Sequence, residues 1–79
     1  MKVTVLFFGA TADTVGSREL EIRADEAATA KSIIDQLSKD HPALAKHKLL
    51  IAINEEYADP DTLLKDGEEV ALFTAVSGG

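Results

Sequence analysis

Residues 69–79 read EVALFTAVSGG, an apolar run that leads into two terminal glycines. Glu69 to Phe73 has the length and composition of a strand, and the preceding Asp66-Gly67 is a strong turn signal. The other strongly apolar run, residues 3–8 (VTVLFF), is rich in β-branched and aromatic residues and predicts a strand buried on both faces. Because these two strands are the most apolar, we expect them to be neighbours at the centre of one sheet.

The intervening sequence predicts one helix and two further strands. Residues 18–22 alternate, with Leu20 and Ile22 facing inward, and residues 49–53 form a third apolar strand. The helix is expected over residues 27–39, where one face collects the apolar side chains Ala30, Ile33, Ile34 and Leu37.

The expected helix has an uncertain start and a clear end. Asp25 or Thr29 could cap its first turn, although neither is followed by Glu or Gln three residues later. His41-Pro42 ends it, because the residue before a proline avoids helical geometry.

The remaining segments are expected to be connections. Residues 10–17 are predicted as a loop, residues 54–56 as a turn and residues 57–58 as a short edge strand. Residues 59–61 open another turn, which could continue as one helical turn through residues 63–64. Residues 74–79 show no pattern of their own and form a tail.

The order strand, strand, helix, strand, short strand, strand defines an α+β chain. One amphipathic helix can cover one face of a mixed four- to five-stranded sheet, which is the ubiquitin-like β-grasp architecture. We therefore expect a single β-grasp domain over residues 1–79, with a flexible Gly-Gly tail over residues 74–79 that leaves the end of a central strand.

Composition narrows the classes of partner. The chain has 79 residues, no cysteine and a formal net charge of −6. Without cysteine, any sulfur chemistry must use sulfur brought from elsewhere. The negative charge argues against nucleic acid and anionic membranes, since both attract Lys and Arg. No signal-peptide pattern and no membrane-length apolar run is recognisable, so we expect a cytoplasmic protein.

Conventional catalytic groups are poorly represented. His41 and His47, with nearby Asp40, match no known metal-site spacing, so no metal site is expected. The acidic pairs at residues 55–56 and 68–69 fall in turns or strand starts, where carboxylates are usually solvated. No serine has a recognisable base. The chain on its own is not expected to be an enzyme.

The terminal Gly78-Gly79 pair is the candidate site. Glycines lack side chains, so they can thread a narrow channel and present an unhindered carboxylate. A carboxylate is a poor electrophile until it carries a leaving group. Adenylation by ATP supplies one, and a partner's persulfide can then displace AMP and leave a thiocarboxylate. Gly79 is thus the reactive residue, and Gly78 and Ser77 are the threading residues.

Three stretches carry a family resemblance. Residues 3–10, 48–54 and 64–73, the last running on to residues 76–79, resemble the small subunit of molybdopterin synthase, a MoaD-like sulfur carrier. That family usually has a Pro-Pro pair where this chain has Thr74-Ala75. The long first loop favours the molybdopterin type over the shorter thiamine-pathway carrier.

The resemblance implies a cycle with three partners. An adenylating enzyme related to ubiquitin-activating enzymes uses ATP to activate Gly79, and a persulfide sulfur donor loads it. The large synthase subunit then receives the tail, supplies the catalytic groups and directs sulfur to cyclic pyranopterin monophosphate, within a heterotetramer. No bound cofactor is implied for the carrier itself. The expected partner-binding residues are Phe73, Thr74, Ala75 and Val76.

Three alternatives remain open from the sequence. The chain could carry sulfur for thiamine, tungsten cofactor or cysteine synthesis. It could be a ubiquitin-like modifier that joins Gly79 to lysines of other proteins. It could also be a β-grasp interaction module whose terminal glycines are incidental, in which case removal of Gly78-Gly79 would leave its activity intact.

Overall fold

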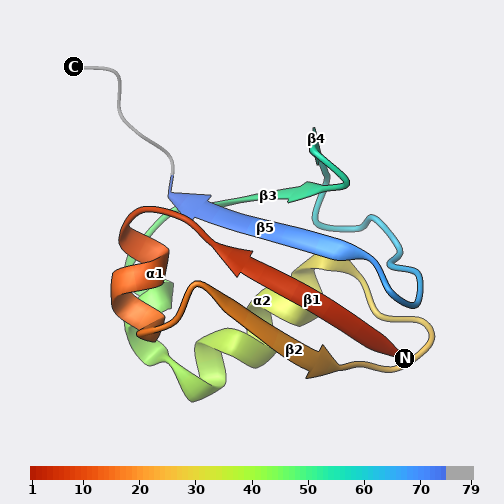
Figure 1. Cartoon of the computed structure of the whole chain (residues 1–79), viewed down its shortest axis with the longest axis horizontal. Coiled ribbons are helices and arrows are strands. Elements are labelled where there is room, and N and C mark those ends of the chain that lie inside the picture. Colours follow the sequence, from red (N-terminus) through yellow and green to blue (C-terminus); the bar gives the residue numbers. More distant parts are fainter. Residues whose placement is uncertain (75–79) are drawn as a thin grey trace.

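The computed structural model describes residues 1–74, so the expectations for Ala75, Val76, Ser77, Gly78 and Gly79 lie outside the described residues. Figure 1 shows the order of the elements along the chain. They are β1 (Lys2–Phe7), α1 (Ala10–Val15), β2 (Glu19–Arg23), α2 (Ala30–Asp40), the 3-10 helix η1 (Pro42–Lys46), β3 (Leu49–Ile53), β4 (Glu56–Tyr57) and β5 (Glu69–Thr74).

The five strands form one mixed sheet in the order β2-β1-β5-β3-β4. β1 and β5 are parallel, whereas β1–β2, β3–β5 and β3–β4 are antiparallel. The expected central pairing of the first and last strands is therefore confirmed. Since parallel strands run in the same direction, β1 and β5 end at the same edge of the sheet, where Phe7 lies opposite Leu72.

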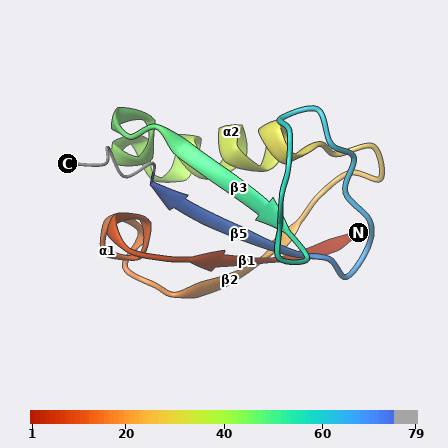
Figure 2. The ribbon, with the colours of Figure 1, turned by 90° about the horizontal axis from the view of Figure 1, so that it is seen from above.

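α2 covers one face of the sheet, which we call the inner face (Figure 2). Alternate residues of β1 point inward, so that Val3, Val5 and Phe7 are buried. The other buried side chains of the core cluster are Ile22, Ala30, Ile33, Leu37, Leu44, Ile51, Ile53, Leu64, Val70 and Leu72. The predicted apolar face of the helix is thus confirmed, with Ile34 half-buried beside the core.

The start of α2 is set by a capping box that the sequence pattern did not reveal. The Thr29 hydroxyl accepts a hydrogen bond from the Ser32 N–H at 3.2 Å, and the Ser32 hydroxyl accepts one from the Thr29 N–H at 2.9 Å. Serine therefore does what Glu or Gln usually does at this position. The helix begins at Ala30, three residues later than predicted, and ends as expected before His41-Pro42.

The loop prediction for residues 10–17 is wrong, because residues Ala10–Val15 form the short helix α1. Six residues are fewer than two helical turns, so no 3.6-residue period is visible in the sequence. Gly16 ends the helix with a φ of 80°, a left-handed conformation that glycine adopts without strain. No helix within residues 1–74 is long and apolar enough to cross a membrane.

The prediction that the first strand is buried on both faces is also wrong. The outward residues Thr4 and Leu6 are half-buried, and Phe8, directly after the strand, is 52% exposed. An apolar run is typical of a doubly covered strand, but here no described helix covers the second face. This sheet therefore presents apolar side chains to solvent.

The segment between β3 and β5 differs from the prediction in two places. The turn after β3 is formed by Asn54 and Glu55, whose φ angles of 51° and 70° suit a tight hairpin, so β4 starts at Glu56. The suggested helical turn through residues 63–64 does not form. Leu63 makes an isolated bridge with Thr29 instead, and Leu64 is buried in the core.

Candidate functional site

The edge at which β1 and β5 end is the place where the chain leaves the sheet. Thr74 is the last residue of β5 and lies opposite Leu49 of β3. The expected tail boundary at residue 74 is therefore corrected, since only residues 75–79 follow the strand. β5 takes the chain from the buried centre of the sheet directly to this edge (Figure 1).

The face opposite α2 carries an apolar surface beside this edge, which we call the outer patch. Its members alternate with buried residues along β1, β3 and β5, follow β1 directly, or pair with β3 from β4. They are Leu6, Phe8, Leu50, Ala52, Tyr57, Ala71 and Phe73. The Tyr57 and Phe73 rings pack at a tilt of 55° with centroids 5.6 Å apart. Phe8 and Tyr57 are exposed, and the other five members are half-buried. Neighbouring apolar side chains that water can reach are typical of interaction sites.

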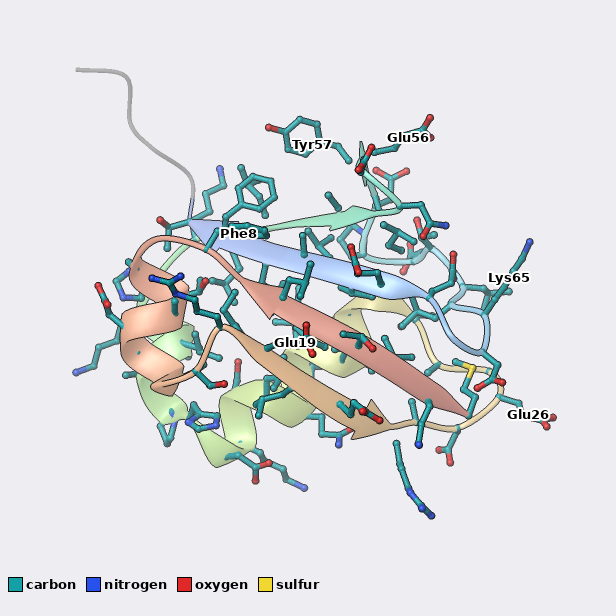
Figure 3. All side chains as sticks on the ribbon, viewed as in Figure 1. Phe8, Glu19, Glu26, Glu56, Tyr57 and Lys65 are labelled. Atoms are coloured by element: carbon teal, nitrogen blue, oxygen red, sulfur yellow. The ribbon has the colours of Figure 1, made fainter. Side chains whose placement is uncertain are left out.

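The two sides of the outer face differ in charge. Glu19 and Glu21 of β2 point outward, and Figure 3 shows Glu19 on the β2 side of the face, away from Tyr57. Lys2 forms an ion pair with Glu21 at 3.4 Å, and both side chains are 63% exposed, so the pair contributes little stability. Charges on an edge strand hinder pairing with another chain. The apolar side of the face is therefore the side suited to binding.

A buried hydroxyl joins the ends of the two central strands. Thr11 of α1 is the one fully buried polar residue among residues 1–74. Its Oγ1 lies 2.7 Å from the Phe8 carbonyl oxygen and 3.0 Å from the Leu72 carbonyl oxygen, and it accepts the Phe8 N–H at 3.0 Å. The Phe8 N–H also donates to the Leu72 oxygen at 3.0 Å.

Of the predicted partner-binding residues, Phe73 and Thr74 are described. Phe73 belongs to the outer patch and is absent from the core cluster, which argues against an ordinary core role. Sequence reasoning missed Phe8 and Tyr57. Continuation of the β1 alternation could have placed Phe8 on the outer face, whereas Tyr57 lies in a strand of two residues that shows no alternation. It also missed Thr11, for which the sequence offers no signal. Within residues 1–74, no three His, Cys, Asp or Glu side chains gather as a metal site.

A mixed five-stranded sheet that packs on one main helix, with its last central strand leading to the chain end, defines a ubiquitin-like β-grasp protein. The chain belongs to the ThiS family, whose model matches residues 5–79. This assignment confirms the predicted fold class and the family resemblance.

Three known proteins illustrate the similarity. The molybdopterin synthase sulfur carrier subunit of Haemophilus influenzae is 35% identical, over 98% of this chain and 99% of that protein. The structure of SAMP1, a small archaeal modifier protein from Haloferax volcanii, has a TM-score of 0.87 and 29% identity over 100% of both chains. The complex of subunits 1 and 2 of the molybdopterin-converting factor from Helicobacter pylori contains a chain with a TM-score of 0.69, 28% identity and 100% coverage of both chains.

Proposed function

We propose that this chain is the sulfur carrier subunit of a molybdopterin synthase and that Gly79 carries the sulfur. The observation that carries the proposal is the course of β5, which runs from the core past the outer patch toward the Gly-Gly end. The similarity to molybdopterin synthase sulfur carrier subunits over nearly the whole chain supports the same function.

The proposed loading uses groups supplied by partners. The Gly79 carboxylate attacks the α-phosphorus of ATP on an activating enzyme, and pyrophosphate leaves. A persulfide of the sulfur donor attacks the resulting acyl-adenylate and displaces AMP. A thiol then cleaves the new S–S bond, so that the thiol and the donor sulfur become a disulfide and Gly79 keeps a thiocarboxylate. The chain itself contains no cysteine, so it cannot provide this sulfur.

Delivery requires docking on the large synthase subunit. The outer patch lies at the edge where β5 ends, so a partner that binds Phe8 and Phe73 would receive the tail as well. Apolar and aromatic residues at the centre of an interface commonly dominate its affinity. The large subunit would supply the catalytic groups that transfer sulfur to cyclic pyranopterin monophosphate, within a heterotetramer. The similarity to a chain of the two-subunit complex from Helicobacter pylori supports this docking.

Intact-mass analysis tests the proposal. The full chain is incubated with the activating enzyme, ATP and a persulfide donor. We expect a mass increase equal to the exchange of one oxygen for one sulfur, located in the C-terminal peptide. The variant that lacks Gly79 should show no increase and should unfold at the same temperature, because the core cluster lies within residues 3–72. A modification that maps to another residue would overturn the proposal.

A second function, protein modification, is favoured by the similarity to SAMP1. It uses the same adenylated Gly79, but a lysine amine of another protein replaces sulfur as the nucleophile. The same incubation, repeated with a cell extract, separates the two functions. A lysine-linked adduct that contains the C-terminal peptide would support modification.

A further inference from the structure

We infer that Thr11 is a positioning residue for the outer patch. Its buried hydroxyl holds Phe8 and the end of β5 in the arrangement that the large subunit binds. This inference rests on the proposed function, because it concerns the affinity for that partner. It assigns to α1 a role that neither the apolar pattern nor the terminal glycines indicate.

The hydroxyl links two strands at one point. It has a single proton, so it donates either to the Phe8 carbonyl at 2.7 Å or to the Leu72 carbonyl at 3.0 Å. In both cases its oxygen also lies 3.0 Å from the Phe8 N–H. Since the Phe8 N–H and the Leu72 carbonyl also bond to each other, the three groups form a small closed network. Thr11 has no access to water that could replace these bonds.

Phe8 depends on this network because its side chain is poorly anchored. It is 52% exposed and follows the last residue of β1. The next residue, Gly9, turns the chain with a φ of 59°, so the bond from the Phe8 N–H to the Leu72 carbonyl is the last one that β5 makes with this end of β1. The described hydrogen bonds of the Phe8 backbone go to Thr11 and Leu72, and the Thr11 side chain takes part in two of them. They fix the backbone from which the ring projects.

Thr11 also secures α1, which has only six residues. A helix of this length has no stability of its own in water, so contacts with the rest of the protein must hold it. α1 forms one wall of a hollow of about 420 Å³ next to Phe8. The residues that line this hollow are Phe7, Phe8, Gly9, Ala12, Asp13 and Arg18. Loss of the Thr11 hydroxyl bonds would therefore change the position of Phe8 and the shape of the adjacent hollow together.

Thr14 offers a matched control on the same helix. Its hydroxyl donates to the Ala10 carbonyl at 2.9 Å, one helical turn earlier, and makes no hydrogen bond to the sheet within residues 1–74. Thr11→Val and Thr14→Val each replace a hydroxyl by a methyl group of similar size. Only the first removes a connection between α1 and the ends of β1 and β5.

The experiment compares wild type, Thr11→Val, Thr11→Ser and Thr14→Val in three measurements. These are the affinity for the large synthase subunit from the same organism, the amide hydrogen exchange of Phe8, and the unfolding temperature. We expect Thr11→Val to weaken binding by about tenfold, the scale of one lost buried hydrogen bond, and to accelerate exchange at Phe8. Thr11→Ser should bind within about twofold of wild type, since it retains the hydroxyl. Thr14→Val should also bind like wild type.

Each result decides the inference. Equal affinities for Thr11→Val and Thr14→Val would reduce Thr11 to a structural role, and a Thr11→Ser variant as weak as Thr11→Val would exclude the hydroxyl as the cause. If Thr11→Val does not fold, Thr11→Cys replaces it, because a thiol is a poor hydrogen-bonding group of similar size. Equal binding of the Cys and Ser variants would then overturn the inference. A wild-type chain that does not bind the large subunit would instead refute the proposed function.

Discussion

Leu72 and Phe73 are consecutive apolar residues of β5, yet they occupy opposite faces of the sheet. Leu72 is fully buried in the core on the inner face, whereas Phe73 lies in the outer patch and packs on Tyr57, which is 77% exposed. In sequence the two residues give the same apolar signal. In the structure the inner face stabilises the fold, and the outer face offers its apolar surface to a partner.

The difference has an energetic basis. Full burial of a side chain such as Leu72 stabilises the folded state by about 1.5–3 kcal/mol, a large part of the roughly 5–15 kcal/mol that small domains possess. An exposed aromatic side chain adds much less, because water still covers part of it. Binding of a partner best explains why the outer face is apolar beside the end of β5 and charged over β2.

The largest stability effect should come from the inner face. Leu72→Ala removes a buried side chain at the centre of the sheet and should lower the free energy of unfolding by about 2–5 kcal/mol. Urea unfolding followed by circular dichroism would measure it. At a temperature where the variant is still folded, its affinity for the large subunit should change little. A large affinity loss in the folded variant would contradict the assignment of stability to the inner face and binding to the outer face.

The outer face should show the reverse pattern. Phe73→Ser should weaken binding to the large subunit by about 2 kcal/mol, since the aromatic ring is lost from the centre of the proposed interface. Its effect on unfolding should be clearly smaller than that of Leu72→Ala. Calorimetric titration and the same urea series provide both numbers. Phe73→Leu is the control, because it keeps an apolar side chain and should retain most of the affinity.

These two faces also show what the sequence could predict. Alternation and apolar runs were sufficient to predict the main strands, and the helical period predicted α2 apart from its start. The high apolar content of the first and last strands predicted the central pairing of β1 with β5. They failed at α1, which is too short to show a period. They also failed at the outer face of β1, because an apolar run does not reveal whether anything covers it.

The residues of the candidate site also differ in whether the sequence could predict them. The terminal glycines could be proposed as the reactive end from the sequence alone, because the proposed chemistry needs only a carboxylate and residues without side chains. They lie outside the described residues, and their role stays a prediction. Phe73 could be proposed from its place near the chain end. Thr11 could not, because its role depends on a carbonyl 61 residues away in the sequence that only the parallel pairing of β1 and β5 brings near.

The smallest expected effect concerns the residue that follows β5. The family usually has Pro-Pro where this chain has Thr74-Ala75, which predicts a tail that must be ordered on binding. Replacement of both residues by proline should therefore raise the affinity for the large subunit. The structure narrows this prediction to Ala75, because the sheet already orders Thr74 opposite Leu49. Proline stabilises mainly by restricting a segment that is otherwise free, and a preceding residue in a strand suits it.

We therefore predict that Ala75→Pro tightens binding to the large subunit by about 0.4–1 kcal/mol and that Thr74→Pro gives no comparable gain. The hydrogen-bond pattern between β3 and β5 explains why Thr74→Pro should lower stability only mildly. The Asn54 N–H donates to the Glu69 carbonyl at 3.3 Å, and hydrogen-bonded and non-hydrogen-bonded pairs alternate from there. Leu49 and Thr74 are therefore a non-hydrogen-bonded pair, so proline at position 74 removes no bond to β3. Calorimetry on both variants, with NMR order parameters for residues 75–79, measures the outcome. Weaker binding of Ala75→Pro would show that the partner uses the Ala75 N–H. A wild-type tail that is already rigid in the free protein would remove the basis of the prediction.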